Sequence, residues 1–176
     1  MTTSLGLIVG AEAALADPAG VDPCEELSHT ARKKGLTIAT AESLTAGSIA
    51  SRLGSASNSG QWFCGGVVAY SKSVKQSVLQ VPPGPVVCEE AARSMVNAVA
   101  TMMGATLTVA VTGEAGPDPQ EDAPVGTVWF AICDRGVVTT ERHQFDGDPG
   151  EIVDATVEKA VELLLTRARD GDTARN

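Results

Sequence analysis

The sequence is poor in aromatic residues and in positive charge. Phe, Trp and Tyr make up 3% of the 176 residues, which argues against a protein that stacks nucleic-acid bases on exposed rings. Lysine and arginine number 13 against 22 aspartates and glutamates, so the formal net charge is −9. Such a surface repels phosphate backbones and anionic lipid headgroups, and no local basic patch offsets it. We therefore expect neither a nucleic-acid partner nor a membrane partner.

Metal-site and nucleotide-loop motifs are also missing. The four cysteines lie far apart, and the two histidines, His29 and His143, fall in unrelated segments. Neither pattern is typical of a zinc site, and the sequence contains no P-loop and no G-x-G-x-x-G. No apolar run approaches the ~18 residues of a membrane helix. Widely spaced cysteines without a pairing pattern are typical of reduced thiols in a cytoplasmic protein.

The apolar content is sufficient for one folded domain. Hydrophobic residues account for 43% of the chain and charged residues for 20%, which is too apolar for a disordered chain. We expect a flexible leader at 1–22, a folded domain at 23–168 and a flexible tail at 169–176. The apolar stretch 5–10 in the leader has no preceding Lys or Arg, so it does not resemble a secretory signal.

Capping residues and apolar periodicity predict helices and strands in alternation. Asp22-Pro23 and Asp148-Pro149 are typical helix starts, with Asp as the cap and Pro in the first turn. Helices are expected at 23–34, after a turn at 41–47 until about 53, at 72–79, at 89–103 and from 148 onward. Strands are expected at 36–40, 61–70, 107–111, 125–133 and 137–145. This order predicts a layered α/β domain with helices on both faces of a sheet.

The segment 37–47 leads from a strand into a helix through small hydroxyl residues. Ser43 and Thr45 stand where unpaired N–H groups and the positive end of the helix dipole converge. That position suits an anion or a developing oxyanion. The alternative is that Ser43 or Thr45 only caps the helix.

A serine nucleophile needs a base, and the scarcity of histidine makes a lysine the candidate. Burial lowers the pKa of lysine from about 10.4 and frees its lone pair. Lys75 follows the strand that ends at Tyr70, the only tyrosine, whose hydroxyl is able to relay or orient a proton. The alternative is an exposed helical lysine and a half-buried strand tyrosine.

The segment 111–117 again places small residues directly after an apolar strand. Thr112, Gly113 and Gly116 allow a ligand to approach the backbone closely. An ordinary turn after a strand is the alternative.

Together these segments resemble one family, the C-terminal domain of CinA proteins, which includes stand-alone nicotinamide mononucleotide amidases. The resemblance covers about residues 23–167 and implies a three-layer α/β/α fold around a mixed sheet, and a homodimer. Four motifs in the family's order carry it: Ala41-Glu42-Ser43-x-Thr45, Gly65-Gly66-Val67-Val68-Ala69-Tyr70-Ser71 with Lys75, Val111-Thr112-Gly113-x-Ala115-Gly116-Pro117-Asp118, and Pro124-Val125-Gly126-Thr127-Val128-Trp129.

The resemblance implies hydrolysis of nicotinamide mononucleotide to nicotinate mononucleotide and ammonia, in the pyridine nucleotide cycle of NAD salvage. Ser43 would attack the amide carbon, Lys75 would take its proton, and Tyr70 would assist the transfer. No metal or organic cofactor is required. Two groups would hold the substrate, by backbone N–H donation and by close approach: Thr45, Ala46 and Gly47, and Thr112, Gly113 and Gly116.

The chain departs from the family's pattern in the residues around these motifs. Leu44 and Ala46 stand in place of Cys and Gly, and the segment 148–153 lacks the usual arginine. Glu114 replaces an apolar residue, and a side chain facing the site should weaken binding of a phosphorylated ligand. Two alternatives therefore stand beside the amidase: a catalytically weakened ligand-binding or interaction module, and a Ser-Lys amidase that acts on a different, less anionic amide, such as a nucleoside.

Overall fold

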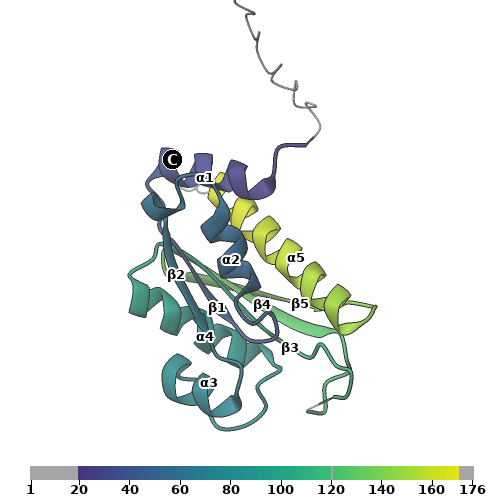
Figure 1. Cartoon of the computed structure of the whole chain (residues 1–176). Coiled ribbons are helices and arrows are strands. Elements are labelled where there is room, and N and C mark those ends of the chain that lie inside the picture. Colours follow the sequence, from purple (N-terminus) through teal and green to yellow (C-terminus); the bar gives the residue numbers. More distant parts are fainter. Residues whose placement is uncertain (1–19, 120, 171–176) are drawn as a thin grey trace, which may run out of the picture.

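Five strands form the middle layer of the protein, and helices cover both faces (Figure 1). The structure, a computed structural model, describes residues 20–119 and 121–170. The strand order is β2-β1-β3-β4-β5. β1 is parallel to β2 and β3, whereas β4 is antiparallel to β3 and β5. The bounds are β1 Ile38–Glu42, β2 Phe63–Val68, β3 Leu107–Gly113, β4 Thr127–Asp134 and β5 Val137–Gln144.

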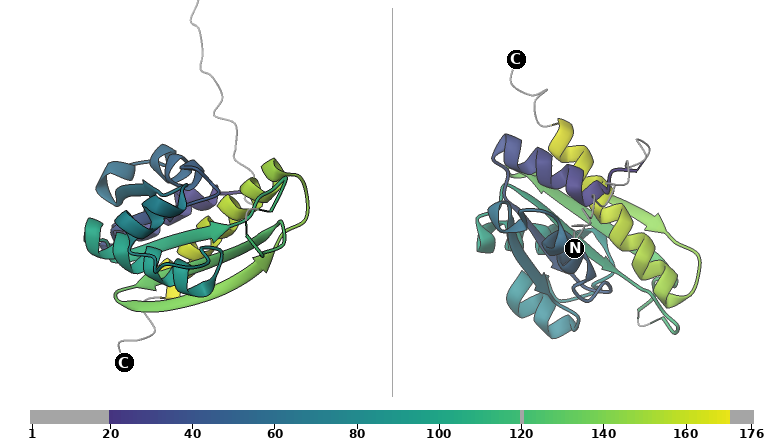
Figure 2. Two further views of the ribbon diagram at one scale, coloured as in Figure 1. Left: turned by 90° about the horizontal axis from the view of Figure 1, so that it is seen from below. Right: turned by 45° about the horizontal axis from the view of Figure 1, so that its top comes forward.

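The helices divide between the two faces of the sheet, which gives the three layers seen in Figure 2. One face packs against α1, α2 and α5, and the other packs against α3 and α4. Their bounds are α1 Pro23–Lys34, α2 Ser48–Ser55, α3 Lys72–Leu79, α4 Glu89–Met103 and α5 Pro149–Asp170. The expected α/β/α fold with a mixed sheet is confirmed.

Both predicted helix starts are present. The Asp22 carboxylate accepts a hydrogen bond from the Cys24 amide at 2.9 Å, with Pro23 in the first turn of α1. Asp148 accepts from the amides of Gly150 and Glu151, while the Glu151 carboxylate accepts from the Asp148 amide at 2.8 Å. This reciprocal pairing satisfies the free donors at the start of α5.

Several boundaries differ from the expected ones. The strand expected at 36–40 lies at 38–42, so Glu42 belongs to it. The strand expected at 61–70 is Phe63–Val68, because a 3-10 turn, η1 Ser59–Gln61, occupies its start. The expected leader and tail lie outside the described residues apart from 20–22 and from 169 and 170, which continue α5.

The parallel strands bring three motifs to one edge of the sheet. The carboxyl ends of β1, β2 and β3 lead into Ser43, Tyr70 and the segment 113–116, respectively. The connection from β1 to β2 through α2 runs over one face of the sheet, and the connection from β2 to β3 through α3 and α4 runs over the other. β2 and β3 therefore lie on opposite sides of β1, and the direction in which strands are added reverses at this point. Ligands of open α/β sheets bind at such points. Within the two described segments, no helix has the length and hydropathy to span a bilayer.

Candidate active site

A cavity of about 480 Å³ opens at this edge of the sheet. It is bounded by the ends of β1 and β3, by the start of α3 and by the loop before α4. Its lining includes Ser43, Leu44, Tyr70, Lys75, Gly113, Glu114 and Gly116. Residues far apart in the sequence therefore meet in one space, as the three motifs predicted.

Ser43 is the first residue after β1, at the start of the turn that leads to α2. Its side chain is 5% exposed and faces the cavity. The hydroxyl makes no hydrogen bond to any residue that the structure describes. Ser43 thus does not cap α2, and its oxygen is available to a ligand in the cavity.

The side chain that caps α2 belongs to Glu42, which the sequence analysis quoted within a motif but gave no role. The fully buried carboxylate accepts hydrogen bonds from three amides, those of Gly47, Ile49 and Ala50, at 2.7–3.1 Å. The hydroxyl of Thr45 donates to it at 2.7 Å, and that of Thr40 donates at 3.2 Å. Five donors surround one buried charge, so the turn is held tightly from inside.

The hydrogen bonds within this turn leave only some of its backbone amides without a partner. Ala46 has φ +49°, a left-handed conformation that costs alanine about 1 kcal/mol. Its amide donates to the Ser43 carbonyl, and that of Gly47 donates to Glu42. Two of the three amides expected to hold an oxyanion therefore already have partners. The amides of Leu44 and Thr45 have none among the described residues.

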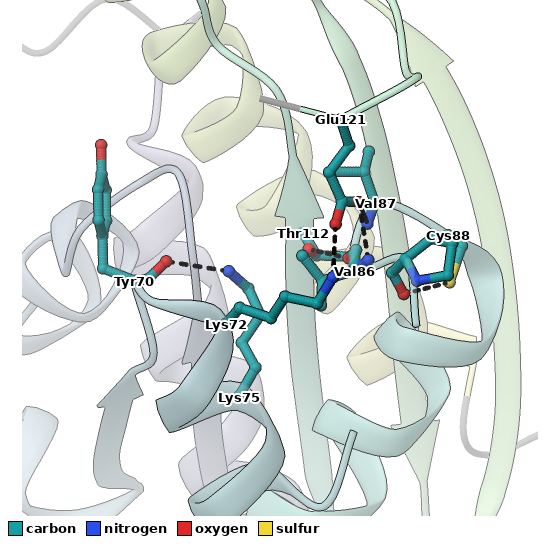
Figure 3. Close-up of polar contacts among 9 residues, drawn as sticks. Tyr70, Lys72, Lys75, Val86, Val87, Cys88, Thr112 and Glu121 are labelled. Carbon is teal, nitrogen blue, oxygen red and sulfur yellow. Dashed lines mark hydrogen bonds and ion pairs between the residues drawn. The ribbon is translucent and has the colours of Figure 1, made fainter. Parts of the chain in front are cut away.

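Lys75 is buried at the start of α3 and lines the cavity with Ser43. Its side chain is 4% exposed, and the amine donates a 3.0 Å hydrogen bond to the Tyr70 carbonyl (Figure 3). Burial lowers the pKa of Lys75, although the charges of Glu121 and Glu114 raise it in part and that of Lys72 lowers it. A buried lysine whose positive charge is disfavoured is suited to accept a proton.

Tyr70 contacts Lys75 through its backbone, not through its phenol. The residue is 64% exposed, and its hydroxyl points away from the lysine amine in Figure 3. Tyr70 nevertheless lines the cavity. The expected hydroxyl relay is therefore not formed in this conformation, and the carbonyl of Tyr70 is the group that orients Lys75.

The loop after β3 contributes backbone and one carboxylate. Gly113 and Gly116 line the cavity, as expected for close approach. Thr112 does not line it, because its buried hydroxyl donates to the Val86 carbonyl at 2.6 Å and fixes the loop before α4. Glu114 is 4% exposed, lines the cavity and accepts from the Gly116 amide at 3.3 Å.

Glu121, in the acidic loop before β4, joins this cavity to a second one. Its carboxylate accepts from the amides of Val86 and Val87 and pairs with Lys72 (Figure 3). Burial raises the pKa of Glu121, but these hydrogen bonds outweigh it and leave the pKa below its usual value. The second cavity, about 770 Å³, is lined by Lys72, Glu121, Trp129 and Arg142 among others. Sequence reasoning treated the loop as an irregular connection and missed this role.

Fold and site together define an α/β/α domain that holds a buried serine and a buried lysine in one cavity at the carboxyl edge of its parallel strands. The chain belongs to the CinA C-terminal domain family, whose model matches residues 22–168.

Two relatives and one solved structure place the chain within the family. The nicotinamide-nucleotide amidohydrolase PncC of Pseudomonas putida is 41% identical over 145 residues, which cover 79% of this chain and 91% of that protein. A CinA-like protein of Geobacter sp. (strain M21) is 41% identical over 154 residues, 81% of this chain. The chain spans 37% of that longer relative. The crystal structure of competence damage-inducible protein A from Klebsiella pneumoniae subsp. pneumoniae MGH 78578 has 32% identity and a TM-score of 0.81, covering 84% of this chain and 96% of that one.

Proposed function

We propose that this chain hydrolyses the carboxamide of nicotinamide mononucleotide, giving nicotinate mononucleotide and ammonia, as a step of NAD salvage in the cytoplasm. The observation that carries the proposal is the pair formed by Ser43 and Lys75. Both line one cavity, the serine hydroxyl has no partner among the described residues, and burial lowers the pKa of the lysine. The similarity to the Pseudomonas putida amidohydrolase supports the choice of substrate.

In the first half of the proposed reaction, Ser43 Oγ attacks the amide carbon while neutral Lys75 accepts its proton. The tetrahedral oxyanion would be held by the amides of Leu44 and Thr45, which have no partners in the described part of the chain. Lys75 then returns the proton to the departing nitrogen. Ammonia leaves, and an ester joins Ser43 to the nicotinate carbonyl.

In the second half, water attacks this ester and Lys75 takes its proton. Collapse of the second oxyanion breaks the bond to Ser43 Oγ, which recovers a proton from Lys75. One water is consumed and one ammonia released, and the scheme uses no metal and no organic cofactor. Tyr70 contributes by holding Lys75 through its carbonyl. Assistance from its hydroxyl requires the exposed ring to turn inward.

Ammonia release from nicotinamide mononucleotide by the purified protein tests this proposal. Wild type is expected to release ammonia, and Ser43→Ala is expected to lose activity by at least about 1000-fold, because the nucleophile is gone. Circular dichroism and thermal unfolding of Ser43→Ala should match wild type. Equal activity in a folded Ser43→Ala protein would contradict the proposal.

A non-catalytic ligand-binding module is the second candidate, and one observation favours it. Glu114 lines the cavity, and no arginine stands in 148–153 to contact a phosphate. Nucleotide binding without turnover by a folded wild-type protein is the result this candidate predicts. The homodimer is likewise a proposal, and sedimentation of the full chain tests it.

A further inference from the structure

The cavity that contains Ser43 is lined by two carboxylates as well as by Lys72 and Lys75. Glu114 and Glu121 both line it. Glu121 is committed to the amides of Val86 and Val87 and to Lys72. Glu114 is the more buried of the two and is held toward the cavity by the loop after β3. A carboxylate with so little water around it interacts strongly with any charge placed in the cavity.

The cavity itself has a second mark of a ligand site. Ser43 is more than nine-tenths buried, lines the same cavity as Glu114, and has a hydroxyl without a partner among the described residues. A group placed against Ser43 therefore lies in the same cavity as the Glu114 carboxylate. The charge of Glu114 already reaches Lys75, since it raises the pKa of that lysine.

We propose that Glu114 is a specificity-determining residue that selects carboxamides on a positively charged, quaternary pyridinium ring over the same amides on a neutral ring. The choice of amide rests on the proposed function. The charge preference follows from the position of Glu114 in the Ser43 cavity, and it is measurable by binding alone.

This preference reverses the consequence expected from the sequence. Glu114 was expected to weaken binding because a carboxylate repels a phosphate. Nicotinamide mononucleotide also carries a positive charge on its ring nitrogen, and the ring bears the amide that must reach Ser43. The phosphate is at the other end of the molecule. The adjoining cavity, which Glu121 and Asp122 also line, offers it Arg142 and the Lys72 that pairs with Glu121. Opposite charges of one ligand thus meet opposite charges of the protein.

A cationic ring also favours the form of Lys75 that the reaction needs. Two positive charges in one enclosed cavity repel each other, so the bound pyridinium favours neutral Lys75. Glu114 reduces the cost of bringing the ring in, and a Lys75 that has given up its proton adds no repulsion. A neutral ring would gain no such attraction from Glu114.

The test compares two ligands that differ in ring charge but keep the same amide, ribose and phosphate. These are nicotinamide mononucleotide and its reduced dihydronicotinamide form, whose ring is neutral. Dissociation constants are measured by calorimetry on full-length Ser43→Ala, so that no turnover disturbs binding. The oxidised form is expected to bind about tenfold tighter than the reduced one.

Three variants in the Ser43→Ala background isolate Glu114. Glu114→Gln keeps an acceptor for the Gly116 amide and removes the charge, so the tenfold preference should fall to about twofold or less. Glu114→Asp keeps the charge and should retain most of the preference. Asp118→Asn removes one charge from an exposed position of the same loop, outside both cavities, and should leave the preference unchanged.

The outcomes separate this inference from the proposed function. If wild type releases no ammonia but the preference and its loss in Glu114→Gln are observed, the amidase proposal fails and the role of Glu114 stands. If ammonia is released and Glu114→Gln keeps the full preference, the role of Glu114 is overturned. Failure of Ser43→Ala to bind the oxidised form at millimolar concentration would also overturn it.

Discussion

At the scale of a single residue, the proposed proton transfer depends on Lys75. The side chain has lost almost all contact with water, and its amine donates a hydrogen bond to the Tyr70 carbonyl. A neutral carbonyl stabilises an ammonium less than a carboxylate would. The charged form is therefore less favourable than in an exposed lysine, so the pKa of Lys75 lies below its ordinary value and the neutral base is present at a lower pH.

We predict that kcat/KM for ammonia release rises with pH and levels off below pH 10.5, the ordinary pKa of lysine. Burial lowers the pKa of Lys75, so the neutral base is present above that lowered value, and activity falls as the pH drops through it. Lys75→Arg should be inactive over the whole range, because a guanidinium does not deprotonate. The measurement is the pH profile of initial rates for both proteins.

An active Lys75→Arg protein would show that another group accepts the proton. Lys72→Arg is the matched control. Lys72 lies three residues earlier, at the exposed start of α3, and keeps its positive charge in this variant. Its pH profile should follow that of wild type.

At the scale of elements, β1 and α2 are joined by a turn that is held from within by Glu42. The carboxylate binds the first amides of α2 and two threonine hydroxyls, so strand, turn and helix are tied to one side chain. Ser43 is the next residue, and the shape of this turn fixes the direction of its hydroxyl. A small displacement of a nucleophile lowers the rate considerably.

We predict that Glu42→Gln lowers the free energy of unfolding by about 3 kcal/mol. The glutamine side chain has no negative charge, and its NH2 group is a donor that faces the donors around it. The same change should reduce kcat by about 100-fold with a smaller effect on KM, since Ser43 is displaced while the rest of the cavity stays. Urea unfolding and ammonia release measure the two effects.

Glu151→Gln is the control for Glu42→Gln. Glu151 also accepts a backbone hydrogen bond at a helix start, but it is exposed and lies on α5, away from both cavities. Glu151→Gln should lower the free energy of unfolding by less than Glu42→Gln does, and it should leave kcat unchanged. A Glu42→Gln protein with wild-type kcat would show that the turn keeps its shape without the charge.

The elements could be predicted to within a few residues because their signals are local. Asp22 and Asp148 mark helix starts through contacts with the next residues in the chain. Glu42 and Glu121 could not be understood in this way. Glu42 accepts hydrogen bonds from donors up to eight residues later in the chain. Glu121 accepts hydrogen bonds from Val86 and Val87, more than thirty residues earlier. Those partners become visible only when the chain has folded.

The candidate site follows the same division. Ser43 and Lys75 follow strands whose carboxyl ends share one edge, so the sequence could bring them together. The direction of the Tyr70 ring and the use of the Ala46 and Gly47 amides depend on which competing contact forms. Thr112 likewise has a choice of acceptor, and it donates to Val86 instead of facing the cavity.

At the scale of the whole molecule, a net charge of −9 opposes the approach of a phosphorylated substrate. Local cations must then supply the attraction. Arg142 on β5 lines the larger cavity next to Trp129, its partner across the β4–β5 pair. Among the described residues it has no ion pair, so its charge is available to a ligand. Arg142 is therefore our candidate for the phosphate contact that the segment 148–153 does not supply.

We predict that Arg142→Ala raises KM for nicotinamide mononucleotide about fivefold, because the phosphate loses one partly exposed ion pair. The unphosphorylated nicotinamide riboside should keep its KM, so the ratio of kcat/KM values for the two substrates falls. Lys33→Ala, on α1 and outside both cavities, makes the same change in net charge and should leave the ratio as in wild type. Equal losses for both substrates in Arg142→Ala would mean that Arg142 shapes the cavity without contacting the phosphate. A wild-type preference for the riboside would instead favour an amidase of less anionic amides.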